Sequence, residues 1–339
     1  MNSSIQLEPR VAAILGALIA DSAALGLHWL YDPERIAQIE KIKGLVYLQP
    51  DTNDYAGTSG YFAHGNKSAG DSSGYGEICL LMLRHFAQHG QFDRIAYQTE
   101  YRSHFGPGGA YIGYVDSPTR QTLQTLLPLK PEEFPENSGA DDDQFAALAA
   151  IPVVVATHTG SQAALKAKIE QVVRLTNHND TAVAAAQYAG CVLLEVLNGK
   201  SISQALTNAL PHAGEKLLPL LEEVMQSHVL DSVAVAKRFG SACHVLEGLP
   251  VIAHIAQQAP DYRTAIEENI RIGGDSCGRA IMLGAIMAAY TAQHSERSFS
   301  IPLEWAARYQ KLSIAAHACA QLGAPVDKFS QNGYNLLNN

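Results

Sequence analysis

Apolar residues recur three and four positions apart along nearly every long segment of the chain, which is the spacing of amphipathic helices. The sequence contains no convincing run of the alternating pattern typical of strands. The pattern therefore predicts an all-α protein. The predicted helices cover residues 11–27, 33–40, 76–88, 93–105, 117–127, 142–157, 161–176, 180–197, 202–210, 217–226, 246–257, 262–272, 279–293 and 302–321.

Residues at the edges of these segments support the predicted boundaries. Short polar side chains can accept hydrogen bonds from the first free amides of a helix, and the N-cap candidates of this kind are Asp93, Ser161, Asp180 and Ser201. Pro302 can occupy a first helical turn, and we expect Gly199 and Gly323 to end helices.

Two segments lack helical periodicity. Residues 44–73 are rich in Gly, Asp, Asn, Ser and Tyr, whereas residues 128–141 contain several prolines and lead into three consecutive aspartates. An irregular segment as long as 44–73 is often functional when it lies inside a compact fold. No repeat of fixed period is visible, and we expect one compact domain over residues 1–339, because large single cores accommodate this length.

Composition narrows the class of protein and of partner. The chain is 47% hydrophobic and only 17% charged, so it has ample apolar surface to bury in a compact globule. Its net charge is −9, and no basic stripe is visible that could neutralise phosphates. We therefore expect a small molecule or a protein as partner, and no nucleic acid.

Targeting and cysteine usage suggest a cytoplasmic protein. The first ten residues lack the basic start and apolar run of a signal peptide, and we expect no membrane span. The five cysteines form no C-x-x-C pair, which indicates reduced thiols. We interpret four of them, Cys79, Cys191, Cys243 and Cys319, as small core residues, and treat Cys277 separately because of its setting.

Cys277 lies in a glycine-rich elbow, residues 271–280, that leads into a helix of small residues. Free backbone amides collect where a helix begins, so this elbow is suited to chemistry or to anion capture. Its candidate side chains are Asp275, Ser276, Cys277 and Arg279, with Gly278 as a backbone donor. The thiol is either a nucleophile stabilised by Arg279 or an inert packing group.

A second glycine-rich elbow, residues 70–77, opens another predicted helix. It carries Asp71, Ser73 and Tyr75. Two elbows of matching design, about 200 residues apart in the sequence, would suit a ligand held between two helix N-termini.

Three further polar residues stand out from their surroundings. Asp21 lies in an almost wholly apolar helix, where a carboxylate needs a partner, so it is either a helix-capping group or a site carboxylate. His28 follows closely and either lines the same pocket or packs. His178 lies at a polar joint between two predicted helices, as a base or an ordinary loop histidine.

In this order, the segments resemble the ADP-ribosylglycohydrolase family, and the segment 27–32 with the last elbow is most similar to the branch that contains the J-type crystallins. The resemblance covers nearly the whole chain. It implies a compact orthogonal helical bundle, a small nucleotide or ADP-ribose-like ligand, and hydrolysis of a glycosidic bond to ADP-ribose. It also implies two magnesium ions, which active members hold with Thr-Asp-Asp-Thr at the first elbow and Asp-Thr-Asp-Thr at the last.

The metal motifs of that family are degenerate here. The first set falls on Ser73, Gly74, Tyr75 and Gly76, and the last falls on Asp275, Ser276, Cys277 and Gly278, so only Asp275 keeps a carboxylate. Magnesium prefers hard oxygen ligands in an octahedral array, which thiols, phenols and glycines do not supply. We expect the metal to be absent or weakened, unless Asp71 or one of residues 141–143, such as Asp142, replaces the missing ligands.

The resemblance and the degenerate motifs leave three functions open. One is a working ADP-ribosyl hydrolase that activates water with a metal or a carboxylate such as Asp275 or Asp71. Another uses Cys277 as a nucleophile with His178 or His28 as base. The third is a catalytically inactive binding or structural protein resembling the J-type crystallins, in which Arg279 and the helix start favour an anion such as phosphate.

Overall fold

The computed structural model describes residues 7–227, 231–294 and 300–322. It is all-α, and within these residues it contains helices and isolated bridges but no strand. The longer helices are α1 (Pro9–Ala24), α2 (Pro33–Lys43), α3 (Gly74–His89), α4 (Arg94–Phe105), α5 (Ser117–Leu126), α8 (Gln162–Val173), α9 (Asp180–Leu197), α10 (Ile202–Ala209), α11 (Gly214–Gln226), α12 (Ser232–Phe239), α13 (Val245–Gln258), α14 (Tyr262–Ile272), α15 (Ser276–Gln293) and α17 (Leu312–Gln321).

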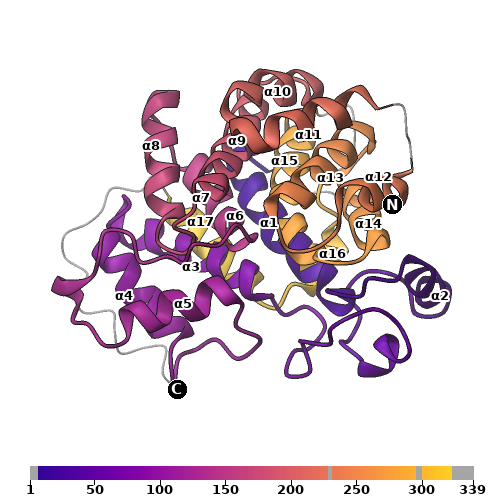
Figure 1. Cartoon of the computed structure of the whole chain (residues 1–339), viewed down its shortest axis with the longest axis horizontal. Coiled ribbons are helices and arrows are strands. Elements are labelled where there is room, and N and C mark those ends of the chain that lie inside the picture. Colours follow the sequence, from indigo (N-terminus) through magenta and orange to yellow (C-terminus); the bar gives the residue numbers. More distant parts are fainter. Residues whose placement is uncertain (1–6, 228–230, 295–299, 323–339) are drawn as a thin grey trace.

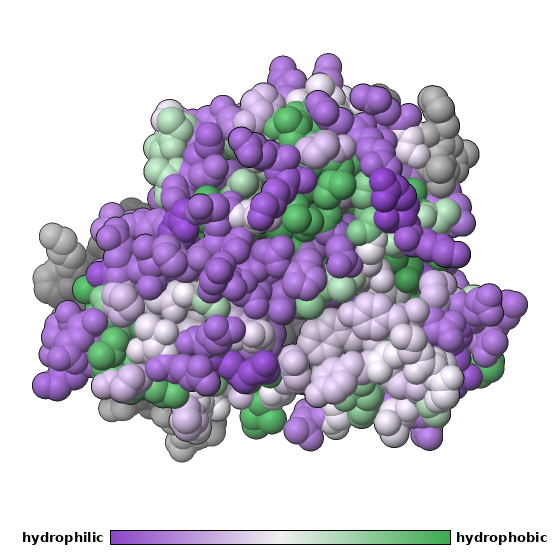
Figure 2. Space-filling view, viewed as in Figure 1, coloured by the Kyte–Doolittle hydropathy of each residue, from purple (hydrophilic) through white to green (hydrophobic). Residues whose placement is uncertain are grey.

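Shorter elements connect these helices. They are η1 (Leu25–Leu27), η2 (Thr52–Tyr55), η3 (Pro131–Glu133), α6 (Ala146–Ala149), α7 (Ile151–Ala156), η4 (Leu210–His212) and α16 (Leu303–Arg308). Figure 1 shows α1 and α15 in the middle of the molecule, with α4 and α5 on one side and α2 on the other. The face seen in Figure 2 is largely hydrophilic and carries only scattered hydrophobic patches.

The central pair of helices, α1 and α15, packs through glycine and alanine. A Cβ built on Gly16 would lie 2.3 Å from Ala288 Cβ, and one built on Gly284 would lie 2.5 Å from the Gly16 carbonyl oxygen. The two backbones can approach so closely only because neither glycine has a side chain. This contact brings the end of α1 and the start of α15 together, which is where the candidate site lies.

Most predicted helix starts are confirmed. Asp93, Ser161 and Ser201 accept hydrogen bonds from amides of the first turns of α4, α8 and α10. At α9 the N-cap is Asn179 instead of Asp180, because the Asn179 side chain takes the Ala182 amide. Gly199 follows the end of α9 with a φ of 84°, whereas Gly323 lies outside the described residues.

Two predicted helices are wrong because tertiary contacts and proline interrupt them. Residues 142–157 form α6 and α7 only from position 146, since the Asp142 side chain accepts the Gln144 amide and the Phe145 amide bonds to Cys243. Pro152 also supplies no amide to the helical ladder. Residues 302–321 split into α16 and α17, where the Gln310 amide bonds to Gly70. Helix α12 was not predicted.

Two helical stretches, Pro9–Leu27 and Asp180–Leu197, are long and apolar enough to cross a membrane. Of these stretches, 89% and 61% respectively is buried inside the protein. Burial of this extent is what core helices show, so their hydropathy is explained by packing around α15.

Candidate functional site

The last elbow is a tight backbone crossing that only glycine can form. Gly273 and Gly274 have φ values of 77° and 66°, and a Cβ on either would lie within 2.4 Å of a backbone oxygen. Hydrogen bonds join Gly274 to the backbone of Trp29 and Leu30 at 2.8 Å each. Trp29 itself has a φ of 65°, a strained conformation for a bulky residue. The crossing fixes the segment after η1 against the start of α15.

Asp275, the N-cap of α15, is completely buried at this crossing. Its Oδ1 accepts hydrogen bonds from the Gly278 amide at 2.8 Å and from His28 Nε2 at 2.9 Å. Its Oδ2 accepts the Tyr75 hydroxyl at 2.8 Å. Burial pushes the pKa of Asp275 upward, but the contacts with His28, Gly278 and Tyr75 outweigh it and hold that pKa below its usual value. The two elbows therefore meet directly, through a carboxylate and a phenol.

His64 extends this cluster from the irregular segment. His28 Nε2 donates to ionised Asp275, and His28 Nδ1 lies 2.7 Å from His64 Nε2. Burial, reinforced by His28 and Lys67, holds the pKa of His64 well below its usual value, so this ring is neutral. Its Nδ1 is buried and has no hydrogen-bond partner among the described residues. The arrangement is a hydrogen-bonded chain from Asp275 through His28 to His64. It ends at His64 Nδ1, the ring nitrogen without a partner among the described residues.

Asp21 anchors the first elbow. Its Oδ2 accepts the Ser73 amide at 2.9 Å and its Oδ1 accepts the Ser73 hydroxyl. Ser73 is in turn the N-cap of α3, and a Cβ on Gly76 would collide with the Asp21 carboxylate at 2.1 Å. Burial raises the pKa of Asp21 to about 6, against the effect of the Ser73 hydrogen bonds. These are the contacts of a carboxylate that holds a helix start in place.

The thiol of Cys277 is enclosed beside Asp21, below the first elbow. Cys277 is fully buried, its Sγ lies 3.5 Å from the Asp21 carbonyl oxygen, and burial raises its pKa well above the usual value. Of its two interpretations, this geometry favours packing. The prediction that Cys243 is a core residue is wrong, because Cys243 is partly exposed. Burial, reinforced by Asp275, raises the pKa of Cys243 to about 12.

The prediction that Arg279 would favour an anion at the elbow is wrong. Arg279 is fully buried, and its guanidinium donates to the carbonyls of Ser241 and Gly273 and to both the side chain and the backbone of Asn269. Burial lowers its pKa to about 10. The side chain therefore binds the carbonyl oxygens at the end of α14 and in the elbow. The sequence showed that Arg279 is close to the elbow, but not which way its side chain points.

Acidic groups surround Asp275. Asp116, the buried N-cap of α5, has a pKa raised by burial and by the charges of Asp142 and Asp275. Asp142 is partly buried, and burial followed by the charge of Asp143 raises its pKa as well. The charges of Asp142 and Asp275 thus both act on Asp116. The surroundings of the elbow are therefore unfavourable for a phosphate.

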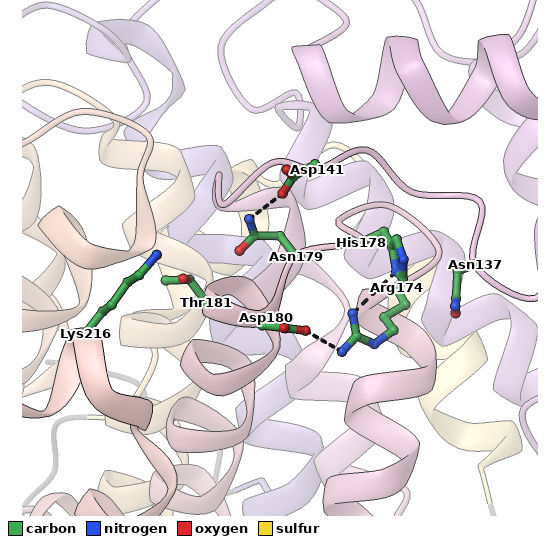
Figure 3. A pocket seen from close by; sticks show the side chains of 8 residues that line it. All are labelled: Asn137, Asp141, Arg174, His178, Asn179, Asp180, Thr181 and Lys216. Carbon is green, nitrogen blue, oxygen red and sulfur yellow. Dashed lines mark hydrogen bonds and ion pairs between the residues drawn. The ribbon is translucent and has the colours of Figure 1, made fainter.

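Two candidate residues lie elsewhere. The Asp71 carboxylate accepts the Ser68 amide at 2.7 Å and closes a turn, without a hydrogen bond to the Asp275 cluster. His178 is exposed and lines a separate open cavity of about 710 Å³, shown in Figure 3. Arg174, which also lines the cavity, contacts both His178 and Asp180. The cavity is lined by Asn137, Asp141, Arg174, His178, Asn179, Asp180, Thr181 and Lys216.

The residues at the elbows do not fit a pair of magnesium ions. Asp275 already accepts three hydrogen bonds, one of them from the Gly278 amide, and the other motif positions carry no carboxylate. Magnesium needs about six oxygen ligands in octahedral geometry. An ion at Asp275 would have to share its two oxygens with the His28 imidazole, the Tyr75 hydroxyl and the Gly278 amide.

A different cluster, His85, His89 and Glu100, has the residue types of a transition-metal site. His85 Nδ1 and His89 Nε2 each lie 2.8 Å from a Glu100 oxygen. However, the Asp93 amide donates to His85 Nε2 at 3.0 Å, so the ring proton must be on Nδ1. A metal would need the lone pair of that nitrogen. In this conformation the cluster instead ties α3 to α4.

The sequence missed three residues that surround Asp275, namely His64, Asp116 and Cys243. The only signal for His64 was its place in the long irregular segment, which was expected to be functional as a whole. Asp116 and Cys243 gave no signal, because their proximity to Asp275 depends on how α5 and the segment before α13 pack.

Comparison with known proteins gives three results. A family model described as ADP-ribosylglycohydrolase matches residues 3–329. Crystallin J1A of Tripedalia cystophora is 29% identical over 342 residues, covering 96% of this chain and 100% of the relative. Crystallin J1B of the same organism is 26% identical over 322 residues, covering 90% and 94%.

Similarity also extends to solved structures. One titled "ADP-ribosylglycohydrolase-related protein complex" has a TM-score of 0.65 at 15% identity, covering 93% of this chain and 97% of that one. At this identity the likeness shows a common fold.

Proposed function

This chain belongs to the ADP-ribosylglycohydrolase family, and we propose that it is a member without a magnesium centre at its elbows, acting as a binding or structural protein. The observation that carries the proposal is the set of contacts around Asp275, where His28 and Tyr75 take the positions that a cation would need. The whole-length similarity to Crystallin J1A and Crystallin J1B supports it.

Electrostatics explains why the loss of carboxylates from the metal motifs goes together with the contacts of His28 and Tyr75 to Asp275. The starts of α3 and α15 present positive partial charge, so cations held between them require several carboxylates. Asp275 is the one carboxylate at the eight motif positions, 73–76 and 275–278, and it is stabilised by an imidazole, a phenol and an amide of the chain itself. The site thus satisfies its buried charge internally.

The ligand class follows from the charges around the elbow. We propose a small molecule of nucleotide or ADP-ribose type whose group nearest Asp275 is uncharged or cationic. Asp116 and Asp142 would repel a pyrophosphate placed there, and Arg279 has its donors committed to backbone and side-chain oxygens. A phosphate-bearing part would therefore lie away from these carboxylates.

A metal-independent hydrolase is the second candidate, favoured by the chain from Asp275 to His64. In it, Asp275 orients His28, and the open Nδ1 of His64 would accept a proton from an attacking water. His64 can then pass a proton from its Nε2 to His28 Nδ1, which places positive charge on His28 beside Asp275.

Titration calorimetry with Mg²⁺ and an assay for release of ADP-ribose from modified arginine and serine test these proposals. We expect no tight magnesium site and no turnover, with an active magnesium-dependent family member as positive control. The matched variant Gly74→Asp/Tyr75→Asp/Cys277→Asp returns carboxylates to the elbows and should bind magnesium more tightly. Two tight sites in the unmodified protein would overturn the main proposal. Turnover without metal that is lost in Asp275→Asn and His64→Phe would establish the second candidate.

A further inference from the structure

Lys67 is a buried lysine without a counter-ion. Its side chain comes from the irregular segment that also carries His64, and the residue is 8% exposed. The ammonium lies over the ring of Tyr111, with Nζ 4.5 Å from the ring centroid. In the described part of the chain, no hydrogen bond or ion pair to this Nζ is present.

Glu77, Asp21 and Asp71 are the carboxylates whose charges favour the protonated form of Lys67, and each is hydrogen-bonded to another group. Glu77 is held by His104 at 3.0 Å and by Lys311. Asp21 accepts both hydrogen bonds from Ser73, and Asp71 accepts the Ser68 amide, as described above. Among the described residues, none of these three carboxylates forms an ion pair with Lys67.

The backbone holds the amine beside the first elbow. The Lys67 amide donates to the His64 carbonyl, and its own carbonyl accepts the Gln49 side chain at 2.9 Å. A Cβ on Gly113 would lie 2.8 Å from Lys67 Cε and 2.7 Å from the Tyr111 hydroxyl, so glycine leaves room for both. The same hydroxyl is 3.5 Å from a Cβ built on Gly74. The amine thus packs against Tyr111, whose hydroxyl lies next to the start of α3.

This setting weakens the charged form of the amine. Burial lowers the pKa of Lys67, and the nearby Lys311 charge adds to the effect against the opposing charges of Glu77, Asp71 and Asp21. By contrast, Lys43 has its pKa raised by hydrogen bonds to Asp54 and Asp51. A neutral amine is the nucleophilic form, so the two lysines should differ in reactivity.

We propose that Lys67 is a reactive amine that captures a small aldehyde, such as the open-chain form of a reducing sugar, as an imine. The ammonium first releases a proton to solvent, and the nitrogen lone pair attacks the carbonyl carbon. The resulting carbinolamine loses its oxygen as water and the C=N bond forms. No oxidant or reductant is needed, and the low exposure of Lys67 restricts the aldehyde to a small one. This capture goes beyond the function proposed above and does not depend on contacts to Asp275.

Labelling of the intact protein with glycolaldehyde and cyanoborohydride tests the proposal. Cyanoborohydride reduces any imine to a stable secondary amine, at which trypsin no longer cleaves, so peptide mass spectrometry reports each lysine separately. Lys43 and Lys311 are internal controls, because both are ion-paired. At pH 7 we expect Lys67 to be labelled faster than Lys43, because the pKa of Lys67 is lowered and that of Lys43 is raised.

Two outcomes decide the matter. Selective early labelling of Lys67, absent in Lys67→Arg with the other sites unchanged, supports the proposal. Labelling of Lys67 in the unmodified protein that is equal to or slower than that of Lys43 overturns it. Because the unmodified protein gives the decisive rates, the test does not require the variant to fold. It also leaves the magnesium result untouched, so the two proposals fail independently.

Discussion

The hydrogen bond from Tyr75 to Asp275 can be tested by removing one oxygen atom. Tyr75→Phe keeps the ring that packs at the start of α3 and deletes the hydroxyl that donates to Asp275 Oδ2 at 2.8 Å. Tyr75 is 2% exposed and Asp275 is fully buried, so water does not readily replace the lost donor. The variant leaves an ionised carboxylate with one partner fewer.

The expected cost follows from the charge of the acceptor. A hydrogen bond to a charged group contributes about 1.5–3 kcal/mol, more than one between neutral groups. His28 and Gly278 remain as donors to Oδ1, which limits the loss to that range. We therefore expect Tyr75→Phe to lower the free energy of unfolding by about 1.5–3 kcal/mol.

Tyr97→Phe is a matched control. Tyr97 is also 2% exposed, but its hydroxyl is buried without a hydrogen-bond partner. Removing an unpartnered buried hydroxyl takes away no hydrogen bond, so Tyr97→Phe should leave the free energy of unfolding unchanged or raise it. Both variants lose the same atom from a buried ring, which isolates the contribution of the Asp275 contact.

Urea denaturation followed by far-UV circular dichroism, at a pH near 7, gives the comparison. The midpoint of Tyr75→Phe should fall clearly below those of the unmodified protein and Tyr97→Phe, with an unchanged slope. Equal midpoints for the two variants would show that Tyr75 does not stabilise Asp275, and the proposed internal replacement of the cation would lose its basis.

Three further measurements probe the surroundings of the site. The folded pKa of Asp21 is raised from 3.8 to about 6, so its contribution to stability is complete below pH 3.8. About 3 kcal/mol of this contribution is lost as the pH rises through 6. Asp21→Asn should therefore flatten the dependence of the free energy of unfolding on pH in this range. Arg279→Lys should lower the free energy of unfolding by about 2–4 kcal/mol, measured by urea denaturation, because an ammonium cannot reach the same set of oxygens; a loss below about 1 kcal/mol would contradict its role in binding them. Gly284→Ala should cost about 1–3 kcal/mol, seen as a lower melting temperature, since its Cβ would collide with Gly16; an unchanged melting temperature would show that α1 and α15 can separate freely.

Part of the candidate site could be predicted from the sequence because its residues lie at helix starts. Asp275 and Tyr75 were singled out by the glycine-rich elbows around them, and the structure brings the two together. Cys277 and Arg279 were singled out by the same reasoning, yet both point into the interior. Position at a helix start is readable from local sequence, whereas the direction of a side chain depends on which helix packs beside it.

Local sequence determined the all-α class and most helix starts, because helical periodicity and N-cap chemistry act over a few residues. It also determined that Asp275 is the one carboxylate at positions 73–76 and 275–278. Only the tertiary structure decided that His28 and Tyr75 hold Asp275, that His64 joins them, and that Lys67 is left without a counter-ion. These contacts join residues up to 247 positions apart, and no local pattern encodes them, because they bring together the start of α15, the segment after η1, the start of α3 and the irregular segment.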